Sequence, residues 1–307
     1  MQSAFRINDI ILVIVVISSM AVAIISPDFG SRFQAFPFYC LMLNFFLSYL
    51  AIDLESVWKE LKGHSVQIMV LTLIKLVVVP VVVYFIFHFI APKYALAAML
   101  LSGVSSGVVS PLISNMVGGN SALVLIVVVI TSVLAPFTLP AIVKIIFAKQ
   151  VAISFLAMLK MLATVIFIPI IAVEIIRYLM PKLVAPILKI QFPLALMAFA
   201  LINLGVFYRY APFFRKDPSV IIMATVVAFV LAAIYCVVGI FFSRGSSLEN
   251  QLASAVILAN INNVLVIVFS SQFFGPVEPL VAAMYMIPFF VVVIPLRYYR
   301  YRKSRVA

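Results

Sequence analysis

The sequence predicts an all-α integral membrane protein of ten transmembrane helices, and both its composition and the spacing of its apolar runs indicate this class. Of the 307 residues, 66% are hydrophobic and only 10% are charged. A soluble domain carries about a quarter charged residues, because its surface must be hydrated. Most side chains of this chain must therefore face lipid or one another.

The charge of the chain excludes a nucleic-acid-binding protein. Its formal net charge is +12, but the basic residues lie in short gaps between apolar runs and form no basic domain. We expect them to orient the chain in the bilayer and to meet anionic headgroups. Cys40 and Cys236 both lie inside apolar runs, so no disulfide framework or metal-ligand spacing is present.

A helix needs about 20 apolar residues to cross the hydrocarbon layer. With this length as the criterion, the sequence predicts spans at 7–26, 34–52, 67–91, 94–117, 121–147, 151–180, 187–208, 219–243, 250–273 and 276–297. The connections are short, and the longest polar one, 53–66, holds the only tryptophan, Trp58. We expect a multi-pass protein of the cell (inner) membrane, monomeric and without a soluble domain.

An even number of spans places both termini on the same side of the membrane. The tail from Arg297 to Arg305 is rich in arginine and tyrosine, which is typical of a cationic, aromatic anchor at the membrane surface. Because basic residues favour the cytoplasmic side, we expect both termini inside, the N-in/C-in orientation.

The fourth span is interrupted by polar and small residues. It contains Gly103, Gly107, four serines before Pro111, and then Ser114 and Asn115. Proline removes a backbone donor, and polar groups at membrane depth are costly unless they line a polar cavity. Close packing of helices through small residues is the alternative interpretation.

The ninth span carries three amides, Asn260, Asn262 and Asn263, between apolar runs. Within four residues they point in different directions around a helix, so a locally unwound helix explains them better than packing. The two unusual spans are the fourth of the first five and the fourth of the second five. Such a pattern is typical of inverted repeats in secondary transporters, here 1–150 and 151–307, whose broken helices meet near the bilayer midplane.

The segment from Leu100 to Pro140 resembles the bile acid:sodium symporter family. The residues that carry the resemblance are Gly107-Val-Val-Ser110, Gly119-Asn120-Ser-Ala-Leu, Thr131-Ser132 and Ala135-Pro136-Phe-Thr-Leu-Pro140, and the stretches Phe46–Trp58 and Val70–Pro80 are also similar. The resemblance implies a panel domain of spans 1, 2, 6 and 7 and a core domain of spans 3–5 and 8–10. It also implies that broken helices 4 and 9 cross in the core.

The ion ligands of that family are altered in this chain. Its two sodium sites would fall on Ser110, Pro111, Val124, Val128, Val256, Asn260 and Lys75. A hard cation needs several oxygen ligands, which valine and proline side chains do not supply. The resemblance therefore implies that sodium coupling at these sites is lost, and Na⁺ or H⁺ remains open as the coupling ion.

Lys75 lies about eight residues into the third span. An ammonium at that depth must find oxygen acceptors or lose its proton. We hypothesise that it takes the place of a sodium ion, against carbonyls of the unwound helix and the Asn260 amide, and couples transport to protons. The alternative is that its stem snorkels toward the membrane surface.

The sequence contains no catalytic arrangement and no P-loop, so we expect neither an enzyme nor an ATP-driven pump. The prediction is a secondary active transporter of a small organic anion, working by alternating access and without a cofactor. The alternatives are a sodium-coupled organic anion or bile acid symporter with a rearranged ion site, a transport-inactive binding or sensor protein, and a channel. The predicted site residues are Lys75, Ser106, Ser110, Asn115, Thr131, Ser132, Asn260, Asn262 and Asn263.

Two acidic residues, Glu174 and Glu278, lie near the ends of predicted spans. Glu174 lies one turn before Arg177, which predicts a surface ion pair. Glu278 lies close to the start of the last span, where we expect contact with water.

Overall fold

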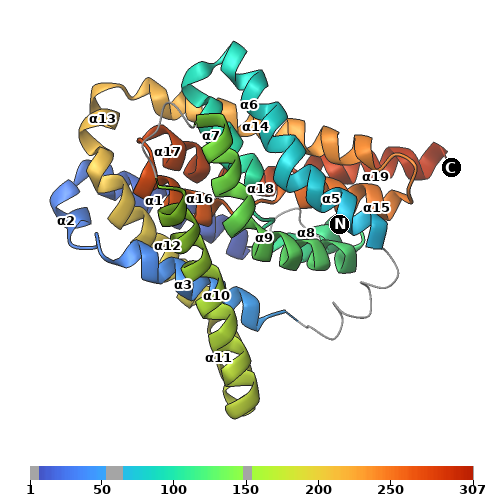
Figure 1. Cartoon of the computed structure of the whole chain (residues 1–307), viewed down its shortest axis with the longest axis horizontal. Coiled ribbons are helices and arrows are strands. Elements are labelled where there is room, and N and C mark those ends of the chain that lie inside the picture. The colour runs from blue at the N-terminus through green and yellow to red at the C-terminus, as the bar shows by residue number, and fades with distance from the viewer. Residues whose placement is uncertain (1–6, 53–64, 148–153, 307) are drawn as a thin grey trace.

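The computed structural model describes residues 7–52, 65–147 and 154–306, and these residues fold into helices (Figure 1). Within the described ranges, one isolated antiparallel β-bridge joins Ser106 to Ile261. The predicted polar loop at 53–66, with Trp58, lies almost wholly outside the described residues.

Six helices of the described chain are both long and apolar enough to cross a membrane, as an integral membrane protein requires. They are Val66–Ile90, Ser121–Phe147, Phe155–Leu179, Gln191–Lys216, Ser219–Phe242 and Val277–Arg305. Shorter apolar helices run over Ile10–Ile25, Phe36–Leu50 and Asn263–Phe273. Together with the apolar composition, these helices identify a multi-pass membrane protein.

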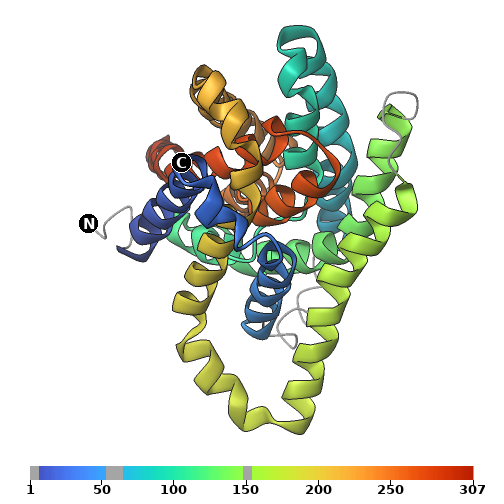
Figure 2. The same cartoon turned by 90° about the vertical axis from the view of Figure 1, so that its left-hand side faces the viewer.

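Four long helices pack on one another and form what we call the first group: α1 (Ile7–Ile25), α3 (Phe36–Leu50), α10 (Phe155–Leu179) and α12 (Gln191–Phe207). Figure 2 shows α10 running away from the rest of the molecule and the chain turning back into α12. Short helices make the connections around this group: α2 (Pro27–Ser31), η2 (Pro181–Leu183), α11 (Val184–Lys189), η3 (Tyr208–Tyr210) and α13 (Ala211–Lys216).

The remaining helices form the second group, which holds most of the fully buried residues. Its first half comprises α5 (Ser65–Leu73), the π-helical turn η1 (Ile74–Val78), α6 (Val79–Ile90), α7 (Pro92–Gly103), α8 (Ser110–Val117) and α9 (Ser121–Phe147). Its second half comprises α14 (Ser219–Phe242), α15 (Leu248–Ala259), α16 (Asn263–Phe273), α17 (Val277–Met284), α18 (Met286–Val291) and α19 (Val293–Val306).

Arginines close the C-terminal ends of two helices in the first group. Arg215 donates to the carbonyl oxygens of Ile24 and Ile25 at the end of α1, at 3.0 and 2.6 Å. Arg177 of α10 donates to the carbonyls of residues 49, 50 and 52 at the end of α3. The last carbonyls of a helix have no partner within it and carry partial negative charge, so a guanidinium satisfies both their hydrogen bonding and their charge.

The two acidic residues singled out in the sequence differ in outcome. Glu174 forms the predicted ion pair with Arg177, at 3.1 Å, and both side chains are partly exposed. The prediction that the Glu278 side chain contacts water is wrong. Its side chain is only 7% exposed, because the neighbouring helices cover the first turn of α17.

Candidate functional site

Two interrupted helices meet in the second group. Helix α7 stops at Gly103, the chain becomes extended at Val104, and α8 begins at Ser110. Helix α15 stops at Ala259, and α16 begins at Asn263. Pro111 is the second residue of α8, where a missing backbone donor costs nothing, so the break comes from the serine and glycine residues before it.

The two breaks are joined through main-chain atoms. The Gly107 amide donates to the Asn260 carbonyl at 2.7 Å, and the Asn262 amide donates to the Ser105 carbonyl at 2.9 Å. A Cβ at Gly107 would lie 3.0 Å from the Ile261 carbonyl oxygen, so glycine permits the close approach. Unwound backbone is tolerated at membrane depth when its polar groups are satisfied in this way. We call this junction, residues 104–109 and 260–262, the crossing.

The C-terminal end of α15 projects four carbonyl groups toward the crossing, and each has a donor. The Val256 carbonyl accepts from the Asn260 amide at 2.8 Å. The other three accept from side chains of distant segments. Ile257 accepts from the Ser106 hydroxyl at 2.7 Å, Leu258 from the Lys75 ammonium at 3.3 Å, and Ala259 from the Tyr285 hydroxyl at 2.7 Å. This end of α15 is therefore fully capped, and one of its donors is a cation.

Lys75 is positioned by an irregular turn of its helix. It lies in η1, a π-helical turn, and such turns are frequent at functional sites because they aim a side chain out of the regular register. The side chain is only 1% exposed, so it does not reach the surface as a snorkelling lysine would. Besides the Leu258 carbonyl, its ammonium lies 5.7 Å from the centre of the Tyr235 ring, within the range of a cation–π contact.

Hydroxyl groups of the predicted site residues bind the crossing directly. Ser110 donates to the Asn260 carbonyl at 2.8 Å. Thr131 of α9 accepts from the Ser106 amide at 3.3 Å and donates to the Val127 carbonyl at 2.6 Å. The Asn260 side chain donates to the Phe289 carbonyl at 2.9 Å. Its Oδ1 oxygen is buried and has no partner among the described residues, so it contacts neither Lys75 nor another donor there.

The structure brings most, but not all, of the predicted site residues together. Ser106 and Asn260 belong to the crossing, and Lys75, Ser110 and Thr131 bind the crossing or the end of α15. Ser132 is buried beside Thr131 on α9.

The side chains of the remaining three asparagines do not bind the crossing, although Asn262 and Asn263 line the cavity described below. Asn262 caps α16 by accepting from the Leu265 amide at 3.2 Å. Asn263 donates to the Ala282 carbonyl at 3.4 Å. Asn115 is exposed on α8, away from the break.

A cavity of about 390 Å³ lies between the crossing and the first group. Its lining includes the N-terminal ends of both α8 and α16, through Val109 and Asn263, and side chains of α3 and α12 on the opposite side. The lining is largely apolar, and the polar groups on the side of the first group are Asn44, Ser48, Lys189 and Gln191.

These polar residues of the first group were missed in the sequence analysis. Asn44 offered a signal, since it is an amide inside an otherwise apolar run, like the asparagines of the ninth span. Its Nδ2 donor is buried and without a partner in the described part of the chain. Lys189 and Gln191 offered none, because polar residues at the end of a span are ordinary.

At the positions that the resemblance assigns to sodium ligands, the side chains are mostly apolar and buried. Val124, Val128 and Val256 are each at most 1% exposed. A buried valine presents methyl groups, which cannot coordinate a hard cation. The Leu258 and Asn260 carbonyls near the crossing are already bound to protein donors. Two buried oxygens, Asn260 Oδ1 and Ser105 Oγ, have no partner within the described ranges.

Comparison with known proteins identifies the family. The chain matches the family model described as Sodium Bile acid symporter family over residues 38–211, which is more than half of its length. The matched region runs from α3 to the start of α13 and includes Lys75 and one arm of the crossing. A search of curated proteins gives no match. The chain thus belongs to the sodium bile acid symporter family, whose members are membrane transporters and not enzymes.

Proposed function

We propose that the protein is a secondary active transporter of a small organic anion, which works by alternating access and does not use the two sodium sites of its family. The observation that carries this proposal is the Lys75 ammonium, bound to the Leu258 carbonyl at the C-terminal end of α15. A positive charge is favourable at that end of a helix. In this proposal Lys75 supplies a cation near the crossing, and valines stand at three of the positions to which the resemblance assigns ion ligands.

In this proposal the chain has ten spans arranged as two inverted repeats, 1–150 and 151–307. The six long helices are joined by α1, by α3 and by the two interrupted pairs, α7 with α8 and α15 with α16. The two interrupted pairs occupy equivalent places in the two halves, and their breaks pair antiparallel through Ser106 and Ile261. Both features agree with the inverted-repeat plan.

The first group would be the panel domain and the second group the core domain. The cavity lies at their boundary, between α3 and α12 on one side and the crossing on the other. A solute there would contact both domains, so movement of one against the other would expose it alternately to each side of the membrane. This arrangement favours a carrier over a channel.

An anion is the solute that the electrostatics of the cavity favour. The N-terminal ends of α8 and α16 both line it, and a helix N-terminus carries partial positive charge and free backbone amides. Lys189 adds a full charge, and the apolar walls would hold a hydrocarbon body. The solute class is therefore an amphipathic carboxylate or a similar anion.

The coupling role of Lys75 is tested in two steps. A thermal-shift screen of the purified protein against aliphatic and aromatic carboxylates, with cholate included, first selects a solute. Uptake of that solute is then measured in liposomes for the wild type, Lys75→Gln and Lys75→Ala, with and without a pH gradient and with sodium or potassium. Lys160→Gln is the matched control, since Lys160 is an exposed lysine within α10.

If Lys75 couples transport to protons, the wild type and the control respond to the pH gradient, and both Lys75 variants lose the response. Unchanged pH dependence in both variants contradicts proton coupling. A requirement for sodium in the wild type instead supports a symporter with a rearranged ion site. Binding of the solute without counterflow supports a binding or sensor protein on this fold.

A further inference from the structure

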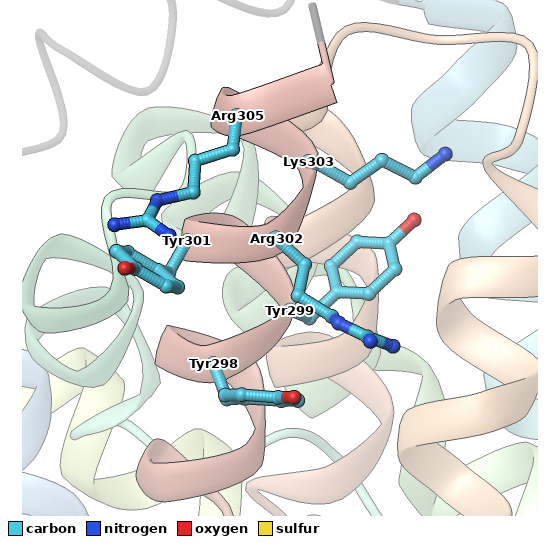
Figure 3. A pocket seen from close by; sticks show the side chains of 6 residues that line it. All are labelled: Tyr298, Tyr299, Tyr301, Arg302, Lys303 and Arg305. Atoms are coloured by element: carbon cyan, nitrogen blue, oxygen red, sulfur yellow. The ribbon is translucent and has the colours of Figure 1, made fainter.

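The last helix carries three aromatic–cation pairs on its surface. In each pair the cation follows the tyrosine by four residues, so the two side chains lie one helical turn apart. The distances from cation to ring centre are 5.6, 6.0 and 4.3 Å for Tyr298–Arg302, Tyr299–Lys303 and Tyr301–Arg305. Figure 3 shows the Arg305 guanidinium close to the Tyr301 ring, and these six residues line a surface hollow of about 670 Å³.

The length of the apolar stretch before these pairs indicates that they lie at the depth of the lipid headgroups. The apolar stretch from Val277 to Leu296 is long enough to cross a hydrocarbon layer of about 30 Å. The chain therefore leaves the hydrocarbon near Arg297, and the residues that follow lie in the interfacial region. Tyrosine is favoured there because its ring is apolar and its hydroxyl is hydrated. Tyr298 and Tyr301 are 59% and 52% exposed, so their rings are available to lipid.

Three side chains of α19 fasten it to the protein, and one of them, Tyr299, also belongs to the pair with Lys303. Arg297 donates to the Met116 carbonyl at 3.1 Å, and Arg300 donates to the Val117 carbonyl at 3.3 Å, so both cap the end of α8. The Tyr299 hydroxyl donates to Gln251 of α15 at 2.7 Å. These contacts fix the rotation of α19, and its other cations consequently face outward at Arg302, Lys303 and Arg305.

We propose that Arg302, Lys303 and Arg305 form a binding site for the headgroups of anionic phospholipids. A guanidinium that lies over a ring keeps the N–H groups of its edge free, and these can donate two parallel hydrogen bonds to phosphate oxygens. The three cations in one turn complement the negative charge of such lipids. The Tyr298 and Tyr301 rings contact the glycerol and upper acyl region below the phosphate.

The site is tested by native mass spectrometry of the full-length protein, purified in detergent and equilibrated with equal amounts of phosphatidylglycerol and phosphatidylcholine. The wild type should retain phosphatidylglycerol in preference. Each headgroup-level charge changes the affinity for an anionic surface about fivefold. The triple variant Arg302→Gln/Lys303→Gln/Arg305→Gln should therefore lower the ratio of the two retained lipids by at least about fivefold.

The control is Arg302→Lys/Arg305→Lys, which keeps all three charges and should keep most of the preference. Because the substituted side chains are exposed, the variants should show the wild-type melting temperature without lipid. An unchanged lipid ratio in the triple variant overturns the proposal. Displacement of phosphatidylglycerol by an equal concentration of inorganic phosphate also overturns it, because the site would then bind a free anion rather than a lipid.

Discussion

At the residue scale, the end of α15 shows how side chains from distant parts of the sequence satisfy one helix. Ser106, Lys75 and Tyr285 each bind one carbonyl there, although they come from three segments that lie far apart in the sequence. A carbonyl that loses its donor in a buried, lipid-surrounded site has no water to replace it. Removal of any one of these side-chain donors should therefore lower the stability of the protein measurably.

Tyr285→Phe removes the hydroxyl that binds the Ala259 carbonyl and leaves the ring in place. We expect a loss of about 1–2 kcal/mol in the free energy of unfolding, because a buried acceptor is left without a donor. The measurement is the thermal or denaturant unfolding of the purified protein in detergent.

Tyr235→Phe is the matched control for this experiment. The Tyr235 hydroxyl lies 2.7 Å from the Ser102 hydroxyl, and Ser102 also donates to the Ala98 carbonyl at 2.6 Å. Removal of the Tyr235 hydroxyl leaves no backbone carbonyl without a donor. The loss in the free energy of unfolding should therefore be smaller, below about 1 kcal/mol. An equal loss in both variants would contradict the special role of the α15 end.

The sequence predicted some of these residues and not others, for a physical reason. Lys75 and Asn260 stand out because a charge or an amide is costly in an apolar run. Tyr285 does not stand out, because the chain holds 12 tyrosines and an aromatic ring is not costly in a membrane span. Glu278 was misjudged because burial depends on neighbouring helices, which position along a span does not reveal.

At the element scale, cations close several helix C-termini. Arg215 closes α1, Arg177 closes α3, Arg300 closes α8 and Lys75 contributes to the end of α15. Charged residues are scarce in this chain, and their repeated use at these ends follows from the partial negative charge of helix C-termini. Without these contacts, the only role assigned to these basic residues would be to set the orientation of the chain in the membrane.

Arg177→Gln tests this use of a cation as a helix cap. Arg177 binds carbonyls at the end of α3 and also pairs with Glu174. If the cap dominates, Arg177→Gln should lower the free energy of unfolding by about 1.5–3 kcal/mol, because charged hydrogen bonds to several carbonyls are lost. Unfolding monitored by circular dichroism in detergent measures the change.

Glu174→Gln removes the ion pair and leaves the cap. Because partly exposed pairs contribute little, it should lower the free energy of unfolding by less than about 1 kcal/mol. A larger loss for Glu174→Gln than for Arg177→Gln would show that the pair, and not the cap, holds this end of the first group.

The helices themselves were more predictable than their ends. The run predicted at 121–147 coincides with α9, because a long apolar segment in a bilayer must form a helix to satisfy its backbone hydrogen bonds. The interruptions fall in the two segments that the polar residues marked. The position of the first break was not predictable from Pro111, because proline is tolerated in the first turn of a helix. The short connecting helices α11 and α13 merge with apolar runs in the sequence and were not foreseen.

At the scale of the whole molecule, the proposed N-in/C-in orientation gives a direct prediction. Helix α14 separates Lys216 from Gly245, and its 24 residues cross the bilayer. In a background without Cys40 and Cys236, Lys216→Cys should react with a membrane-impermeant maleimide on intact cells. Gly245→Cys should react only after the cells are permeabilised. Both positions are exposed in the structure.

The reverse labelling pattern would show that the orientation is N-out/C-out. Equal labelling of both positions on intact cells would show that α14 does not span the membrane. The sequence alone left this orientation dependent on the tail, because basic residues elsewhere are divided between the two sides. The fold class followed from composition, whereas the meeting of the two breaks depends on contacts between residues some 150 positions apart, which one sequence does not contain.

The junction between the two breaks is made of peptide groups, with the Gly107 and Asn262 amides as donors. Peptide groups are the same whichever side chains they carry, apart from the need for a small residue at Gly107. Substitutions of the side chains around the joint can therefore change which ions or solutes the region binds while the joint persists. One scaffold can in this way acquire new ligands through a handful of point mutations, without any rebuilding of its architecture.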